Sequence, residues 1–422
     1  MGLLLHALAA ATLAQGSAPA VDTGVASADV EQAAPATTPE PARADETGRW
    51  TFGGAVRGRY DLRLDDADAS GRPKRSSHLS FDTVILKADY DSSTWFASGQ
   101  YRFYGGNFMY RQAYGYENYP GEVSFPVYAY GGRKLGARDK VAVGLQPVPF
   151  DDQWWGSAFL NSMGFAIGLE EVYNVGVTYE HVGGDYTVQA GYFPTTAPDA
   201  FGISDDSARY SVNVTAAGPT AASSSRNEER DMAVGRAQYH LSTPAGADLA
   251  FSASAWLSTV RNLDTRQDGS RRAYALSVRA TRGPYHAKVL AARQSFDLRD
   301  TGDRDVVSVG DYDSAYSIAA KSNLFFAEVG RDLSLPALPF KTSLYANYAR
   351  LTKDAAGFKD TQRLVAGAFW TDKAEGRIRV WSEVLLGRND PYVGAGQFAS
   401  GAARGGDDRW KTSVLVIFGY YF

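Results

Sequence analysis

The chain has 422 residues, no cysteine, and 43 Lys and Arg against 47 Asp and Glu, which gives a formal net charge of -4. The absence of cysteine excludes thiol catalysis, disulfides and cysteine-ligated zinc, and the balanced charge without a basic tail argues against a nucleic-acid partner. The length allows two soluble domains or one large barrel. Mean hydropathy is -0.29, yet the chain holds 43 Gly, 25 Tyr, 21 Phe and 8 Trp. It is therefore polar on average but rich in aromatic and turn residues.

The first segment has the pattern of an export signal. Leu3 to Ala14 form an apolar core followed by small residues, which predicts a signal peptide over residues 1–20. A short buried helix is the alternative, because no Lys or Arg precedes the apolar core. Residues 21–48 are rich in Ala, Pro and Glu and predict a disordered linker. No later run reaches the roughly 18 apolar residues of a membrane helix, so an exported chain of this kind is periplasmic, secreted or an outer-membrane barrel.

From Arg49 onward the side chains alternate with a period of two, which is typical of half-buried strands. Segment 173–179 carries Tyr and Val on one face and Asn, Gly and Thr on the other. Segment 377–386 sets Ile, Val and Leu against Arg and Glu. No helix is predicted after the signal. The chain is therefore expected to be all-β.

The connections between these strands alternate between short and long ones, as in outer-membrane barrels with short periplasmic turns and long external loops. A first count gives eighteen strands but places short and long connections on both rims. Assigning 207–215 to the long loop 194–229, and treating 314–333 as one long tilted strand, restores the alternation. We therefore predict a transmembrane antiparallel β-barrel of sixteen strands over residues 49–422, with eighteen strands as the alternative.

The chain ends "VLVIFGYYF", a strand whose last residue, Phe422, is aromatic. A strand with no turn signal after it needs a partner on each edge, so Phe422 is predicted to close the barrel against the first strand. This ending resembles the closing strand of Gram-negative outer-membrane porins. The stretches "GLQPVPF", "NSMGF", "LEEVYNVGV" and "NEERDMAVGRAQY", the last followed by "SASAWLSTVRNLDT", are similar to the sixteen-stranded general and substrate-selective porins, with no subfamily assigned.

The resemblance implies a homotrimer, passive diffusion of solutes, and a third long loop folded into the lumen. It also implies that the terminal aromatic residue is read by the barrel-assembly machinery. The loop at about 148–165 follows the fifth predicted strand, where these porins place their constriction loop. It carries Asp151, Asp152, Trp154 and Trp155. The two tryptophans either offer an aromatic face to sugar rings or anchor the loop against the wall.

If the apolar faces of the strands contact lipid, the opposite faces line the pore and are rich in cations. These are Arg57, Arg59, Arg63, Arg102, Arg236, Arg279, Lys288, Arg377, Arg379 and Lys411. The acidic residues predicted to face inward are fewer: Asp61, Glu180 and Glu383. Such a wall raises the local anion concentration. Alternatively, the arginines pair with inward carboxylates and with Asp151 and Asp152.

Two other classes of function stay open at this point. A barrel enzyme such as an outer-membrane phospholipase needs a base beside a nucleophile, and the nearest candidates are His78 with Ser80, and His181. A soluble all-β carbohydrate-binding protein would pack its apolar faces against each other. The acidic loop 298–312 lacks the glycine and remaining ligands of an EF-hand and is predicted to be solvated, so no metal or cofactor is expected.

These patterns favour a porin of the Gram-negative outer membrane. It is expected to pass small hydrophilic solutes, with a preference for anions or sugars. Its expected partners are membrane lipid, lipopolysaccharide, the barrel-assembly machinery and two further copies of itself.

Overall fold

The computed structural model describes residues 48–67, 70–105, 123–152, 162–198, 209–215, 226–312, 314–395 and 397–422. The predicted signal peptide and all of the linker except residue 48 lie outside these ranges, and so do Trp154 and Trp155. Among the described residues, no helix is long and apolar enough to cross a membrane.

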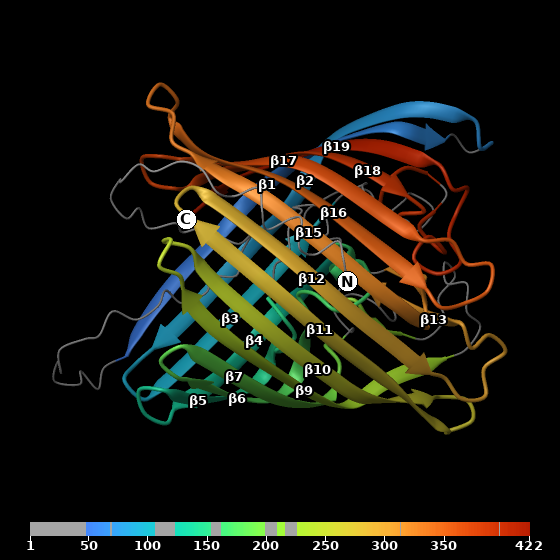
Figure 1. Cartoon of the computed structure of the whole chain (residues 1–422), viewed down its shortest axis with the longest axis horizontal. Coiled ribbons are helices and arrows are strands. Elements are labelled where there is room, and N and C mark those ends of the chain that lie inside the picture. The colour runs from blue at the N-terminus through green and yellow to red at the C-terminus, as the bar shows by residue number, and fades with distance from the viewer. Residues whose placement is uncertain are drawn as a thin grey trace.

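Sixteen antiparallel strands close into one barrel, which confirms the predicted fold class and strand number (Figure 1). The strands of the wall are β1 (Arg49–Ala67), β2 (Pro73–Asp91), β3 (Trp95–Tyr104), β4 (Val123–Lys134), β5 (Asp139–Pro147), β6 (Tyr173–Val182), β7 (Tyr186–Thr195), β9 (Asn227–Ser242), β10 (Asp248–Asn262), β11 (Asp268–Arg282), β12 (Tyr285–Asp297), β15 (Lys321–Leu333), β16 (Phe340–Lys353), β17 (Thr361–Asp372), β18 (Ile378–Arg388) and β19 (Trp410–Tyr421). Each pairs with its neighbours in the ring, so no sheet edge is left open.

The first and last strands form the seam of the barrel. β19 pairs with β18 on one edge and with β1 on the other. Beyond the last ladder pair, the Phe422 and Gly54 backbones exchange two N–H···O bonds of 3.0 Å each. On the outer surface the ring of Phe418 lies over Gly58, where a Cβ would approach it to 2.5 Å. Leu415 and Ile417 alternate with these outward residues and are buried inside, as their strand phase predicts.

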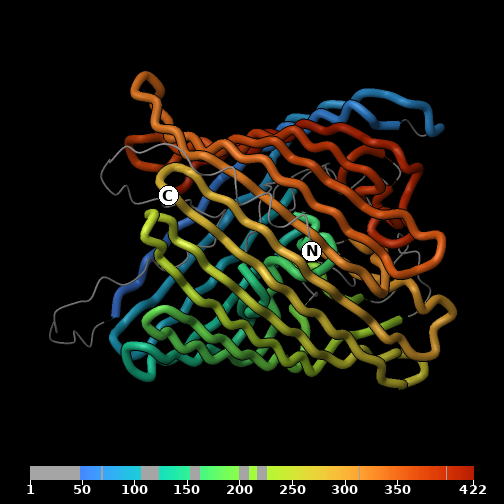
Figure 2. Tube along the Cα trace, in the orientation of Figure 1, coloured from blue at the N-terminus to red at the C-terminus, as the bar shows by residue number. Residues whose placement is uncertain are grey.

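The two rims differ. One rim carries both ends of the barrel sequence and the short turns, such as 183–185 and 283–284, and we call it the short-turn rim (Figure 2, left). At the opposite rim the wall strands lead into the long connections, whose described parts lie within 148–172, 196–226, 298–320 and 389–409, and we call it the long-loop rim. The β1–β2 hairpin extends past its neighbours at that rim (Figure 1, upper right), since β1 pairs with β19 only as far as Arg63.

The outer surface of the wall is apolar. Large apolar side chains are exposed at alternate positions around it, among them Val143, Val177, Leu276, Val329 and Leu364. Exposed aromatic residues lie near the short-turn rim (Trp95, Tyr186, Tyr239, Tyr285) and near the long-loop rim (Tyr192, Tyr274, Phe325, Trp410). Soluble monomers do not expose apolar surface on this scale, and a band with aromatic girdles is the lipid-facing surface of a membrane barrel. This excludes the soluble all-β alternative.

A second, smaller sheet lies inside the barrel. It has three strands in the order β14 (Ser314–Ala319), β13 (Val306–Asp311), β8 (Asn213–Val214). The β13–β14 hairpin starts at the wall, where the Phe296 N–H on β12 donates to the Ala320 carbonyl at 2.7 Å. At its tip the Tyr312 ring packs on Tyr104 of β3 and Phe125 of β4. Strands β12 and β3 are eight positions apart in the sixteen-strand ring, so this hairpin crosses the lumen.

This internal sheet corrects two predictions. Segment 314–333 is not one tilted strand: β14 belongs to the internal hairpin and β15 to the wall, with Ala320 between them. The sequence hides this break because alternation continues across it. Loop 298–312 is not wholly solvated, since β13 is buried along its entire length. The described part of 207–215 is not a strand of the wall and belongs to a long loop, as predicted; its strand β8 is part of the internal sheet.

Candidate channel constriction

After β5 the chain turns into the barrel at residues 148–152, and the part described from Ser162 onward begins with a buried single-turn helix, α1 (Met163–Ala166). The entry of the chain is fixed by the Val148 N–H, which donates to the Val172 carbonyl at 2.8 Å, and by Phe150, whose ring packs edge-on against Trp256 of β10. Asp151 has a φ of 54°, in the left-handed region that aspartate tolerates better than bulky residues. The carboxylates of Asp151 and Asp152 both reach the wall from this turn.

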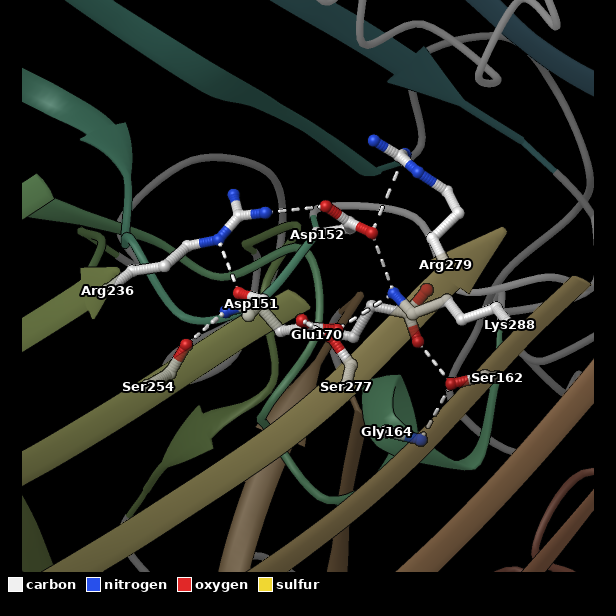
Figure 3. Close-up of polar contacts among 11 residues, drawn as sticks. Asp151, Asp152, Ser162, Gly164, Glu170, Arg236, Ser254, Ser277, Arg279 and Lys288 are labelled. Atoms are coloured by element: carbon white, nitrogen blue, oxygen red, sulfur yellow. Dashed lines mark hydrogen bonds and ion pairs between the residues drawn. The ribbon is translucent and has the colours of Figure 1, made fainter. Parts of the chain in front are cut away.

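Asp151 and Asp152 meet a cluster of polar side chains from β9, β10, β11 and β12 (Figure 3). Asp151 accepts from Ser277 Oγ at 2.5 Å and from Lys288 Nζ at 2.8 Å, and its own N–H donates to Ser254 Oγ at 3.0 Å. Lys288 Nζ also donates to Asp152 at 2.9 Å. These contacts join the loop to three neighbouring strands, and we call the two carboxylates with Arg236, Arg279 and Lys288 the constriction cluster.

Two arginines complete the cluster at Asp152. Arg236 donates to Asp152 Oδ1 at 2.7 Å, and Arg279 lies 3.6 Å from Asp152 Oδ2. Burial opposes ionisation of Asp152, but the charges of Lys288, Arg279 and Arg236 outweigh it and hold its pKa well below the usual value. Three cations thus face two carboxylates. The Arg279 side chain is 36% exposed, more than any other member.

The arginines of the first strand lie on the opposite wall. β1 is eight positions from β10 in the ring. Arg57 Nε donates to Asp82 at 2.8 Å, while Arg59 donates twice to Asp61, at 2.6 and 2.7 Å. Asp82 is the extra residue of a β-bulge in β2 between the partners of Arg57 and Gly58, and a bulge of this kind re-aims a side chain. The sequence pattern did not place Asp82 inside because the bulge shifts the phase of β2.

The other predicted wall residues have varied surroundings. Arg102 is buried, donates to Gln100 and Tyr104, and lies over the Tyr210 ring. Arg63 is half-buried near the long-loop rim. Arg379 is half-buried with its guanidinium 4.4 Å from the Tyr421 ring centroid. Arg377 does not fit the prediction: it precedes β18, is exposed, and contacts Glu375 and Tyr420 at the short-turn rim.

Two buried ion pairs that the sequence did not single out hold the internal loops. Arg271 of β11 pairs with Glu229 of β9 at 3.0 Å and donates to the Gly168 carbonyl, just after α1, at 2.7 Å. Arg363 of β17 makes a bidentate pair with Asp390 of the 389–409 loop, at 2.7 and 2.8 Å. Both arginines alternate with outward residues on their strands, but their partners come from distant segments, so spacing gave no signal for the pairs.

Within the described ranges, no group of three or more acidic or histidine side chains is placed to hold a metal ion. Neither His78 nor His181 hydrogen-bonds a serine hydroxyl in that part of the chain. His181 instead lies 2.8 Å from Asp139 and 3.4 Å from the Tyr186 hydroxyl. The residues considered for an enzyme are therefore not assembled into a nucleophile and base.

No family model matches the sequence, and no curated protein matches it. Solved structures do match. The outer membrane channel DcaP of Acinetobacter baumannii aligns with a TM-score of 0.55 and 12% identity, over 90% of this chain and 99% of that one. The anion-selective porin from Comamonas acidovorans aligns with a TM-score of 0.53 and 15% identity, over 89% and 100%. OmpT, an outer membrane protein of Vibrio cholerae, aligns in its trimer form with a TM-score of 0.53 and 13% identity, over 89% of this chain and 99% of that one. The chain thus has the fold of these proteins, and the predicted resemblance is confirmed for the fold.

Proposed function

We propose that this chain is a porin of the Gram-negative outer membrane that passes small hydrophilic solutes by passive diffusion and favours anions. Support comes from a closed barrel that is apolar outside and charged inside. The observation that carries the anion preference is the constriction cluster, where three cations face two carboxylates. Arg279, its most exposed member, is the group best placed to attract a passing anion.

Sugars are included among the solutes of this proposal, with Trp154 and Trp155 as their proposed contacts. We also propose a homotrimer, because the chain shares its fold with the trimer form of the Vibrio cholerae protein. Membrane lipid and lipopolysaccharide would surround it. The barrel-assembly machinery would read the strand that ends at Phe422. A covalent activity is not part of the proposal, since no observation favours the phospholipase alternative.

The test is the reversal potential of the refolded protein in a planar bilayer under a KCl gradient. We expect stepwise conductance with a chloride-favouring potential. Arg279→Glu should move the potential towards potassium, whereas Arg377→Glu, which makes the same charge change at an exposed position outside the strands, should leave it unchanged. A wild-type channel that prefers potassium would contradict the anion preference. A folded barrel that gives no conductance steps would contradict the porin assignment.

A further inference from the structure

The outer face of β11, β12, β15 and β16 is hollowed near the long-loop rim. A groove of about 630 Å³ lies there, with Ala291 between the larger side chains of Leu276 and Phe325. A second recess of about 310 Å³ is lined by Arg272, Lys321 and Ser295, among others. The two share Tyr274 and Arg293 in their lining, so the polar recess continues the apolar groove towards the rim. We call them together the rim groove.

The strand register explains why the groove is amphipathic. Leu276 pairs with Ala291, and Ala291 with Phe325, so a small residue stands between two large ones. Four residues further along the same strands, Arg272 pairs with Ser295, and Ser295 with Lys321. Neighbouring strands are about 4.8 Å apart, which puts the backbones of Arg272 and Lys321 about 10 Å from each other across a small hydroxyl residue. Two long cationic side chains at that spacing can close on one oxyanion.

These two cations are not neutralised by the protein. In the part of the chain that the structure describes, the exposed side chains of Arg272 and Lys321 make no hydrogen bond, ion pair or ring contact. Their neighbours differ. Arg293 donates to Asn323 and Asp354 at 2.8 Å each, and Arg350 pairs with Asp360 at 2.6 Å. Cations at the edge of hydrocarbon are costly unless an anion or water reaches them, so the rim groove has positive charge to spare for a ligand.

We propose that the rim groove binds one phosphate-bearing, acylated lipid of the outer leaflet, namely the lipid A part of lipopolysaccharide. Its phosphate lies between Arg272 and Lys321, where Arg supplies a fork of donors and Lys a point charge. One acyl chain lies over Ala291, between Leu276 and Phe325. This inference rests on the proposed function: an outer-membrane porin has its long-loop rim in the outer leaflet, which contains lipopolysaccharide.

The test is native mass spectrometry of the refolded protein in detergent, titrated with diphosphoryl lipid A. We expect one saturable site per chain. Arg272→Glu combined with Lys321→Glu should weaken binding about tenfold or more, as expected for losing charge-assisted hydrogen bonds and reversing their charge. The matched control is Arg138→Glu combined with Lys341→Glu. It makes the same charge change at two exposed positions at the short-turn rim, and it should bind like the wild type.

A second variant tests the apolar half without changing charge: Ala291→Trp fills the floor of the groove and should also weaken binding. Heat-modifiable gel mobility checks that every variant has folded. Lipid A without its phosphates should bind weakly, and phosphatidylglycerol or inorganic phosphate should fail to displace lipid A.

Wild-type affinity in the Arg272/Lys321 variant would overturn the proposal. Equal binding of dephosphorylated lipid A or displacement by inorganic phosphate would do the same. Neither result bears on conductance, which is measured separately in bilayers. Conversely, a folded barrel without channel activity that still binds lipid A would overturn the porin function and leave the lipid site standing.

Discussion

The outer surface of the wall and the interior of the barrel both hold Arg–Asp ion pairs, but the pair compared outside is exposed to water and the one inside is buried. Outside, Arg350 and Asp360 form a pair whose side chains are 52% and 30% exposed. Inside, on the neighbouring strand β17, Arg363 and Asp390 form a pair whose side chains are 1% and 0% exposed. An exposed pair competes with water and contributes little, whereas a buried pair depends on each partner to neutralise the other. The interior beside β17, where the 389–409 loop packs against the wall, is therefore as dry as a protein core although it holds a charge pair.

The largest effect is expected from breaking the interior pair. Arg363→Ala leaves Asp390 buried without its cation and also removes the link between β17 and the 389–409 loop. We expect a loss of about 3–5 kcal/mol in the free energy of unfolding. Urea unfolding of the refolded protein in detergent, followed by tryptophan fluorescence, measures it.

The matched control is Arg350→Ala on the outer surface, which should cost at most about 1 kcal/mol. The double variant Arg363→Ala with Asp390→Ala should recover part of the loss, because the stranded carboxylate is gone. Similar losses for Arg363→Ala and Arg350→Ala would show that the 389–409 loop does not depend on its ion pair, and the contrast between the two surfaces would not hold.

The same contrast explains what the sequence could predict. The wall is governed by a period of two, so side-chain alternation was enough for the strands and for the direction of residues such as Leu415 and Phe418. Their number came from the alternation of short and long connections. The interior is built by loops that meet far from each other in the chain. The hairpin from Val306 to Ala319, the bulge at Asp82 and the partner of Arg363 all depend on tertiary packing that no local pattern records. The two carboxylates of the 148–165 loop were singled out only through the resemblance to porins.

Asp311, at the tip of the internal hairpin, shows how burial in the interior changes the pKa of a single carboxyl group. Its carboxylate is fully buried, and Oδ2 has no hydrogen-bond partner among the described residues. Burial raises its pKa well above the usual value, although Ser314 and the charge of Arg209 oppose this. A raised pKa in the folded state means that stability is highest at or below the unfolded pKa of about 3.9 and falls as pH rises towards the folded value.

Asp311→Asn removes this titration. We expect the wild type to lose stability relative to the Asn variant between pH 5 and pH 8, by up to about 1.4 kcal/mol for each pH unit, because the carboxyl of Asp311 is ionised in the unfolded chain but stays protonated in the folded one. Urea midpoints at several pH values measure the difference, and every other titrating group is common to both proteins. A difference that stays constant with pH would show that water or a cation reaches Asp311.

The smallest pH effect is expected at Asp152, which three cations surround, whereas burial dominates the pKa of Asp311. Its pKa is lowered, because the cations Lys288, Arg279 and Arg236 outweigh the effect of burial. A lowered pKa contributes stability above the unfolded value of about 3.9, which is lost only as pH falls through the folded value. Asp152 should thus stay ionised from pH 7 to pH 4.5. Asp152→Asn removes one negative charge and should move the reversal potential towards chloride by the same amount at both pH values. A shift that shrinks as pH falls towards 4.5 would mean that Asp152 protonates in this range, and that the three cations do not hold it as the geometry indicates.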